Sequence, residues 1–427
     1  MKKVPLYIKI IAGMLAGVLF AIVAIQFSGG VKFTRDWIKP FGNIFINMLK
    51  LIAVPLILAS LIKGVSDLKD ISKLSRMGLR SVVLYLFTTV FAVCLGLVIV
   101  NIIKPGASIS EETRTQMLSA YGGDANKKQQ EAVQQKDSGP LQFLEDIVPD
   151  NIINAASTNS TMLQVIFFAL FLGISLILIP AERAKPVKDF FDSFNEVILK
   201  MIDLIMKIAP FGVFALMAAL VAESPGFEIF KALGKYALTV LIGLVILIFI
   251  FYPVLIFLFT KRNPIQFIKQ VYPAQLLAFS TSSSAATLPV TMETVEKRVG
   301  VDNEVSSFVL PIGATVNMDG TSLYQAVAAV FIAQAFGMDL GLTAQLGIIV
   351  TATLASIGSA AVPSAGMVML VIVLAQAGIP EAGLALIFAV DRPLDMVRTV
   401  ANVTSDCTVA TIVAKSIGKL EDPHPVV

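Results

Sequence analysis

Long blocks of apolar residues alternate with short polar segments along the chain. Before residue 264, six blocks are each long enough to cross a bilayer as a helix of roughly 20 residues. These blocks are residues 6–27, 41–62, 82–103, 161–179, 196–222 and 236–259. Three more apolar blocks follow Pro264. The pattern predicts an all-α polytopic membrane protein.

The composition agrees with a membrane location. Of the 427 residues, 56% are hydrophobic and 15% are charged, and the mean hydropathy is +0.81, far more apolar than an ordinary soluble domain. Lys2 and Lys3 precede the first block, as in a secretory signal, but the block is too long for a signal, so we expect a transmembrane helix. The net charge of +3 gives no indication of nucleic acid, and we expect none; the lipid bilayer is an expected partner.

Lysine and arginine gather in alternate short loops between the blocks. They are Lys2 and Lys3; Lys63, Lys69, Lys73, Arg76 and Arg80; Arg183, Lys185 and Lys188; and Lys261, Arg262 and Lys269. Because cytoplasmic loops are enriched in Lys and Arg, we expect these loops and the N-terminus on the cytoplasmic side of the plasma (inner) membrane. The longest polar segment, residues 104–159, then falls outside, where we expect a flexible loop.

After Pro264 the apolar blocks are interrupted by small polar residues and glycines. Residues 280–289 and 356–366 are two such breaks, and both contain Ser-Ala-Ala followed shortly by proline. A pair of Gly/Pro-interrupted segments at matching places indicates a binding site at the midplane of an inverted-repeat transporter. The alternative is a helix interface rich in small residues, which packing in lipid also favours. The breaks alone do not decide between them.

The last segment contains a polar stripe. Asp391, Asp395, Arg398, Asn402 and Asp406 follow one another at spacings of 4, 3, 4 and 4 residues, so they lie within an arc of roughly 80° on one helical face. Each charge at the bilayer centre costs about 2.5 to 3.5 kcal/mol on insertion scales. A stripe of five favours a binding site, although for one member such as Asp391 a buried ion pair between helices is an equal alternative.

The embedded charges of the last segments do not balance. They are Asp319, Asp391, Asp395 and Asp406 against Arg392 and Arg398. Four carboxylates against two guanidinium groups leave minus two, which protonation or bound cations must neutralise. Carboxylate, amide and carbonyl oxygens are the ligands that hard cations prefer. Cation coupling is therefore expected, with proton coupling as the competitor.

Residues 315–321, Thr-Val-Asn-Met-Asp-Gly-Thr, look superficially like part of a calcium loop. They lack the first acidic residue and the final glutamate of such a loop and lie in an apolar segment. We interpret them as an unwound stretch whose carbonyls and side chains hold cations.

Three motifs make the chain recognisable: the serine-rich residues 282–286, Asn-Met-Asp-Gly at 317–320, and residues 395–406. Together they resemble the dicarboxylate/amino acid:cation symporter family, the prokaryotic relatives of the excitatory amino acid transporters. The likeness covers nearly the whole chain. It implies sodium-coupled uptake of L-glutamate or L-aspartate, with a proton-coupled symporter or a C4-dicarboxylate carrier as the alternative.

The resemblance also implies an architecture. Members have eight transmembrane helices and two re-entrant hairpins in inverted repeats, form homotrimers, and move a transport domain like an elevator. The expected scaffold is residues 1–77 (helices 1 and 2) and 160–222 (helices 4 and 5). The expected transport domain is residues 78–103 (helix 3) and 223–427, which include hairpin 1 at about 264–296 and hairpin 2 at about 342–374; residues 104–159 form the external loop.

The family's binding residues are expected at matching positions. Arg398 would pair with the substrate's side-chain carboxylate and Asp395 with its amino group. The remaining expected substrate contacts are Asn402, Ser283 and Ser284 for the main-chain carboxylate, the hydroxyls of Thr321 and Thr399, and Val362, Pro363 and Gly366 in the hairpin 2 gate.

Three sodium ions, co-transported with the substrate, are expected at three sets of oxygen ligands. The first set is Gly313, Asn317, Asn402 and Asp406. The second is Thr315 with Ser356, Ile357 and Ser359. The third is Tyr85, Thr88, Thr89, Asn317 and Asp319.

Two residues refine the expectation. Animal members have a glutamate, thought to bind the co-transported proton, where Gln325 stands here, and glutamine does not titrate. Asp395 separates the chain from dicarboxylate carriers, whose substrates lack an amino group.

The rival classes are a channel, which would not need an Arg398–Asp395 pair, and a hydrolase, for which no intramembrane histidine or lysine forms a recognisable dyad. We therefore expect a transporter and not an enzyme.

Overall fold

The structure is a computed structural model that describes residues 6–66, 75–110, 148–157, 162–223, 228–357 and 365–421. Within these ranges the chain is almost entirely helical and contains no strand, apart from an isolated β-bridge between Val301 and Leu420. The all-α prediction is confirmed.

Several helices are long and apolar enough to cross a membrane. In the described residues there are four, Ile8–Ile25, Gly30–Ala59, Met77–Ser108 and Ile229–Thr260. A fifth span is possible if the bent pair Ala181–Ile205 and Lys207–Ala219, which meets at 47°, counts as one. This number is lower than the number of predicted blocks because several helices are short, as α9 is, or contain buried charges, as α19 does. The multi-pass prediction is confirmed, and the count of eight spans stays a prediction.

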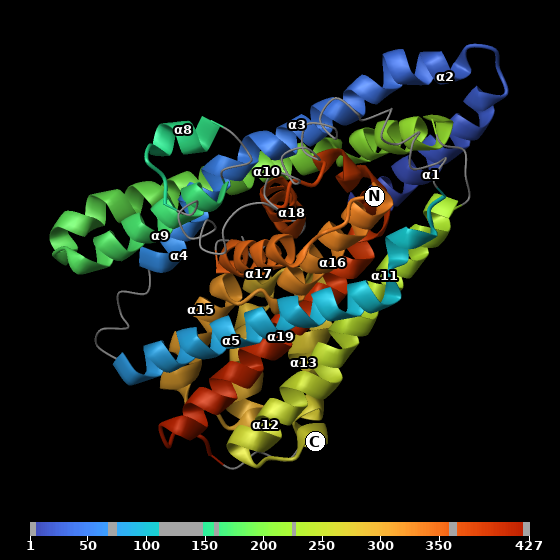
Figure 1. The fold of residues 1–427 in the computed structure, drawn as a ribbon. Coiled ribbons are helices and arrows are strands. Elements are labelled where there is room, and N and C mark those ends of the chain that lie inside the picture. The colour runs from blue at the N-terminus through green and yellow to red at the C-terminus, as the bar shows by residue number, and fades with distance from the viewer. Residues whose placement is uncertain are drawn as a thin grey trace, which may run out of the picture.

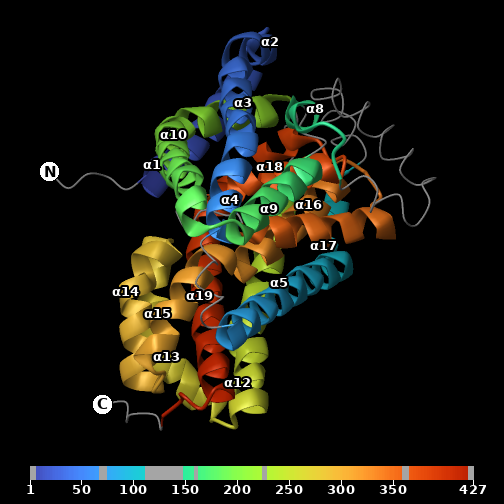
Figure 2. The same ribbon diagram turned by 90° about the vertical axis from the view of Figure 1, so that its left-hand side faces the viewer.

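One group of helices lies at one side of the molecule (Figures 1 and 2). Its long members are α1 (Leu6–Ile25), α3 (Lys39–Leu56) and α10 (Ala181–Glu223), and α1 and α3 both pack against α10. Its shorter members are α2 (Gly30–Phe33), the π-helical turns η1 (Thr34–Ile38) and η2 (Ile57–Leu61), α4 (Ile62–Ser66), α8 (Ile152–Ser157) and α9 (Met162–Leu178). Apart from α8, which lies in the predicted external loop, these helices lie in the residues for which the sequence predicts the scaffold.

The second group surrounds α19 (Leu384–Ser416), the long helix drawn in red. Its members include α5 (Ser75–Ile103), η4 (Pro105–Ser108), α11 (Glu228–Ile246), η6 (Leu247–Phe251), α12 (Tyr252–Thr260), α13 (Pro264–Thr281), α14 (Ser284–Thr294), η7 (Val295–Val299), α15 (Asn303–Val316), α16 (Asp319–Ala335), α17 (Leu342–Ile357), α18 (Ala365–Gln376) and η8 (Glu381–Gly383). α5, α11 to α16 and α10 all contact α19. Because α19 is enclosed by helices, its polar stripe is shielded from lipid.

A sharp turn follows α13 in the first predicted break. Ser282 has φ 51, a left-handed conformation uncommon for a residue with a side chain. The hydroxyl of Ser283 then accepts a hydrogen bond from the backbone N–H of Ala286 at 3.1 Å and caps α14. α13 and α14 pack against each other, so residues 264–294 form a helical hairpin, within the predicted range.

A second interruption separates α15 from α16 at Asn317 and Met318, whose backbones are not helical. Helix ends leave backbone groups without intrahelical partners, and neighbouring helices supply them here. The amide of Gly320 donates to Asn402 Oδ1 at 2.8 Å, and Ser356 donates its hydroxyl hydrogen to the carbonyl of Val316 at 3.3 Å. The predicted unwound stretch is therefore present and is held by α19 and α17.

The second predicted hairpin corresponds to α17 and α18, which pack against each other. Its tip, residues 358–364, lies outside the described residues, and with it Ser359, Val362 and Pro363. The predicted external loop has a short helix at each end, η4 and α8, and its residues 111–147 also lie outside the described ranges.

Close packing of α1 on α10 generates a prediction about stability. A Cβ added to Gly13 would lie 2.3 Å from the carbonyl oxygen of Pro210, whereas one added to Gly234 meets nothing within 4 Å. Gly13→Ala should therefore lower the melting temperature in detergent, because separating the helices costs about 1 to 3 kcal/mol. Gly234→Ala, the matched control, should be neutral or stabilising, since alanine favours helix by roughly 1 kcal/mol. Equal melting temperatures for the two variants would contradict the close α1–α10 contact.

Candidate functional site

The polar side chains of α19 form two groups. Those of one group donate hydrogen bonds to backbone carbonyls of α19 itself, and those of the other contact side chains of other helices. Thr399, Thr404, Thr408 and Thr411 donate their hydroxyl hydrogens to the carbonyl four residues earlier, at 2.6 to 2.8 Å, a common solution for a buried hydroxyl in a helix. The predicted stripe differs, because its side chains are buried and contact charged or amide groups. It therefore defines the site.

Arg398 is the centre of one cluster. Its side chain has no exposed surface, and its Nη2 lies 3.0 Å from Asp391 Oδ1 and 2.8 Å from Asp395 Oδ1. The guanidinium carbon lies 3.8 Å from the centroid of the Tyr324 ring on α16, a cation–π contact. Arg392 reaches the other oxygen of Asp395 at 3.1 Å. In this cluster two carboxylates are matched by two guanidinium groups.

The ion pairs with Asp391 and Asp395 use only the Nη2 donor of Arg398. Its Nη1 and Nε are buried, and neither has a hydrogen-bond partner among the described residues. Gly366 on α18 faces them: a Cβ there would lie 3.6 Å from Nη1 and 2.9 Å from the methyl carbon of Thr321. A buried charged donor without a partner is costly, so this side of Arg398 is suited to an anionic group.

Asn402 lies one turn further along α19 and contacts the α15–α16 break. Its Oδ1 accepts from the amide of Gly320, and its Nδ2 lies 3.4 Å from Thr321 Oγ1 and 3.3 Å from the sulfur of Met318. The 3.4 Å contact to Thr321 Oγ1 is long for an N–H···O hydrogen bond, and the sulfur of Met318 is a weak acceptor, so this amide is weakly bonded.

Asp406 lies in a second cluster, further along the same face. Its Oδ1 accepts a hydrogen bond from Asn317 Nδ2 at 2.8 Å. A Cβ added to Gly313 would lie 2.5 Å from both Asp406 Oδ1 and the hydroxyl oxygen of Tyr85. The structure therefore brings Gly313, Asn317, Asp406 and Tyr85 together, and only a residue without a side chain fits at position 313.

Asp319, at the first turn of α16, is fully buried and accepts three hydroxyl hydrogen bonds. The donors are Thr89 at 2.7 Å, Ser405 at 2.7 Å and Tyr252 at 3.0 Å. Thr88, one residue before Thr89 on α5, contacts Asn317 Oδ1 at 3.4 Å. The predicted third sodium set is thus gathered around two carboxylates, with Asn317 between them.

The charge of the site is unevenly placed. In the part of the chain that the structure describes, no ion pair involves Asp319 or Asp406, and their hydrogen-bond partners are hydroxyl and amide groups. Since the Arg398 cluster is balanced, the minus two of the sequence count resides at these two aspartates. Their surroundings are oxygen-rich, which suits a hard monovalent cation better than a transition metal.

The other predicted ligands are less closely gathered. Ser356, at the end of α17, contacts the end of α15 through Val316, next to Thr315, whose exposed hydroxyl donates to the carbonyl of Ile312. Ile357 ends α17. Ser283 and Ser284 begin α14 at the hairpin tip and are both buried. The roles assigned to all these residues stay predictions.

Three site residues were missed from the sequence. Ser405 occupies the expected face, seven residues after Arg398, and the spacing could have identified it. No sequence feature marks Tyr324 and Tyr252 as site residues, because a tyrosine in an apolar helix is common and their contact partners are distant in sequence.

The chain was compared with known proteins. The sequence profile described as the sodium:dicarboxylate symporter family matches residues 6–416. Excitatory amino acid transporter 3 of Oryctolagus cuniculus is 36% identical over 448 residues, covering 96% of this chain and 85% of that protein. The proton/sodium-glutamate symport protein of Bacillus caldotenax is 34% identical over 423 residues, covering 99% of this chain and 97% of that protein. The similarity spans both helix groups and the whole site.

The contact at Gly313 generates a prediction. Gly313→Ala places a methyl group where Asp406 and Tyr85 now lie, so the carboxylate must move. Sodium affinity, measured as the rise in melting temperature when sodium replaces choline, should fall by roughly 10- to 100-fold, as for disturbed metal ligands elsewhere. Gly347→Ala on α17, where a Cβ meets nothing within 4 Å, is the matched control. Unchanged sodium stabilisation in Gly313→Ala would exclude Asp406 from the ion site.

Proposed function

The chain belongs to the sodium:dicarboxylate symporter family. We propose that it takes up an acidic amino acid, L-glutamate or L-aspartate, and that an inward sodium gradient drives this uptake. As a member of this family it is a membrane transporter and not an enzyme. Relatives whose names specify glutamate or excitatory amino acids support the substrate class.

The observation that carries the proposal is the open side of Arg398. A planar guanidinium with two donors that have no partner in the described residues matches a carboxylate, and Gly366 and Thr321 lie beside these donors. In the proposal the substrate's side-chain carboxylate binds Arg398 and its ammonium group binds Asp395. The main-chain carboxylate binds Asn402 and the hairpin 1 residues Ser283 and Ser284.

The remaining substrate contacts complete the proposed pocket. Thr321 and Thr399 line it; the Thr399 hydroxyl hydrogen is donated to the Asp395 carbonyl, so its oxygen is what it offers a ligand. Val362, Pro363 and Gly366 belong to the proposed gate of hairpin 2, which closes over the substrate.

The coupling ion is proposed to be sodium. Asp319 and Asp406 place two unmatched negative charges beside hydroxyl, amide and backbone oxygens, and a bound cation neutralises them without a proton. The three proposed sets are Gly313, Asn317, Asn402 and Asp406; Thr315, Ser356, Ile357 and Ser359; and Tyr85, Thr88, Thr89, Asn317 and Asp319.

Two alternatives use the same fold. The glutamate thought to bind the co-transported proton in animal members is replaced here by Gln325, which donates to the carbonyl of Gly366 at 3.3 Å and does not titrate. A C4-dicarboxylate carrier has no use for Asp395 beside Arg398, since its substrate has no ammonium group. Both observations favour the sodium-coupled amino acid symporter.

The proposal includes an architecture. The α1–α3–α10 group forms the scaffold of a homotrimer in the plasma (inner) membrane, with the N-terminus in the cytoplasm. The helices around α19 form the transport domain, which contains the two re-entrant hairpins and moves across the membrane as one body. Eight spans arranged in inverted repeats complete the scheme.

The coupling ion can be tested directly. In proteoliposomes, uptake of labelled L-aspartate and L-glutamate should follow an inward sodium gradient at constant pH on both sides, because sodium neutralises Asp319 and Asp406. A pH gradient with choline in place of sodium should drive none. Undiminished uptake under the second condition would establish the proton-coupled alternative.

Selectivity tests the role of Arg398. Arg398→Thr should abolish acidic amino acid uptake and admit serine or alanine, because a neutral substrate no longer leaves a buried guanidinium without a partner, a penalty of about 2 to 5 kcal/mol. Arg392→Thr is the matched control: it also removes an arginine beside Asp395, yet Arg392 is partly exposed, and selectivity should persist. Near-normal aspartate affinity in a folded Arg398→Thr protein would overturn the assignment.

A further inference from the structure

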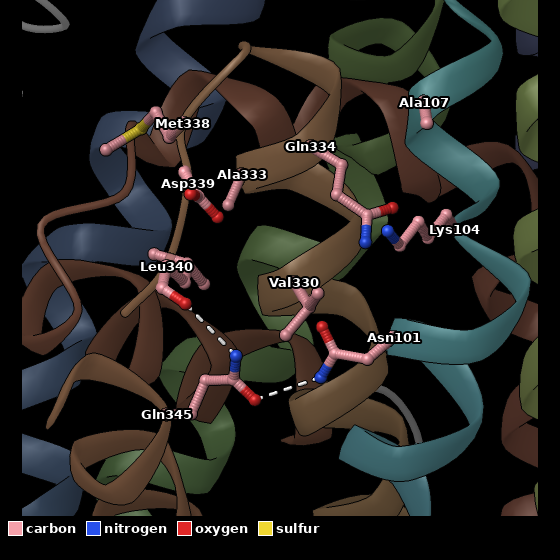
Figure 3. Close-up of a pocket in the computed structure, with 10 residues that line it drawn as sticks. All are labelled: Asn101, Lys104, Ala107, Val330, Ala333, Gln334, Met338, Asp339, Leu340 and Gln345. Atoms are coloured by element: carbon pink, nitrogen blue, oxygen red, sulfur yellow. Dashed lines mark hydrogen bonds between the residues drawn. The ribbon is translucent and has the colours of Figure 1, made fainter. Parts of the chain in front are cut away.

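A cavity of about 220 Å³ lies where α5, α16 and α17 meet, away from the polar stripe of α19 (Figure 3). Its walls come from the end of α5 and η4, the last turns of α16, the link after α16 and the first turn of α17. The residues that line it are Asn101, Lys104, Ala107, Val330, Ala333, Gln334, Met338, Asp339, Leu340 and Gln345.

The amide side chains of this cavity form a fixed frame. Asn101 Nδ2 donates to the carbonyl of Leu97 at 2.8 Å and to Gln345 Oε1 at 2.9 Å, and Gln345 Nε2 donates to the carbonyl of Leu340 at 3.1 Å. Gln334 Oε1 accepts from the amide of Gly106 at 3.1 Å. These bonds join α5 to α17 and α16 to η4, so the walls of the cavity are held by hydrogen bonds without a ligand.

Two opposite charges line the cavity. Lys104 follows α5 and Asp339 precedes α17, and Figure 3 shows their side chains on opposite sides of the space. Neither forms an ion pair with the other or with any residue in the described ranges. Lys104 has φ 48, a backbone conformation that is uncommon for a residue with a side chain.

Beside the amides of Asn101, Gln334 and Gln345, the lining has an apolar part. Val330, Ala333, Met338 and Leu340 contribute to it, so the site offers a positive group, a negative group and an apolar surface. A ligand with both charges can pair with Lys104 and Asp339, whereas a simple ion can pair with one of them. The volume is below the roughly 300 to 1,000 Å³ of pockets for drug-sized ligands.

We propose that this cavity is a second ligand site, which binds a small zwitterion of amino-acid size with an apolar side chain. The ligand's carboxylate pairs with Lys104, its ammonium group pairs with Asp339, and its side chain covers Val330 and Ala333. The site is independent of the proposed transport site, since none of its lining residues belongs to the Arg398, Asp406 or Asp319 clusters.

Occupancy of the site bears on transport. α17 is the first arm of the hairpin whose second arm, α18, places Gly366 beside Arg398. A ligand that bridges Lys104 and Asp339 fixes the start of α17 to the end of α5. It therefore acts as a modulator of hairpin movement and not as cargo.

The test uses labelled L-leucine as the probe on the purified full-length protein, with sodium and unlabelled L-aspartate at saturation to fill the central site. Saturable L-leucine binding should remain. Lys104→Ala and Asp339→Asn should each weaken it roughly tenfold or more, because each leaves one charge of the ligand without a partner. Lys200→Ala, which removes an exposed lysine from α10, should leave it unchanged.

Two competitors define the ligand class. Isovalerate has the carboxylate without the ammonium group, and isoamylamine has an amine without the carboxylate; each should compete at least about tenfold more weakly than L-leucine, since each meets one repulsive charge. If isovalerate competed as well as L-leucine, the cavity would be a site for anions and not for zwitterions, and the proposal would be overturned. Absence of saturable L-leucine binding, or binding in both charge variants as tight as in the unaltered protein, would also overturn it.

Discussion

Two buried carboxylates, Asp319 and Asp406, have no positive partner in the described part of the chain, and they impose the strongest constraint on this structure. Charge taken out of water is costly unless it is paired or neutralised, and hydrogen bonds from Thr89, Tyr252 and Ser405 compensate only part of that cost. The helix break at residues 317–318 and the glycine at position 313 follow from the same need, because both bring oxygens or open space to the carboxylates. The site is thus organised to receive cations.

The division of charge along α19 explains how ion and substrate binding can be linked. Around Arg398 the charges balance, and the donors Nη1 and Nε have no hydrogen-bond partner among the described residues, which suits a substrate anion. One to two turns away the unmatched charge suits cations. Asn402 stands between the two clusters and bonds to Gly320 at the start of α16, next to Asp319. A change at either cluster therefore acts on the same helix ends.

The sequence predicted the stripe on α19 and the breaks well, because both depend on local spacing and on residue types that are costly in lipid. It predicted a charge of minus two but not where that charge lies, since Arg392 reaches Asp395 only through side-chain geometry. Tyr252 and Tyr324 could not be predicted, as their contacts join helices distant in the chain. The number of membrane-spanning helices could not be counted from the apolar blocks either, because buried helices such as α19 and α16 do not face lipid and need not be apolar.

Coupling between the two clusters is tested most directly by equilibrium binding of L-aspartate to the purified protein as sodium replaces choline at constant pH and ionic strength. If sodium neutralises Asp319 and Asp406 while substrate binds Arg398, the logarithm of aspartate affinity should rise with the logarithm of sodium concentration with a slope of about one or more. The dependence should be reciprocal, with aspartate increasing sodium affinity by the same factor. An aspartate affinity that does not change with sodium would contradict the account.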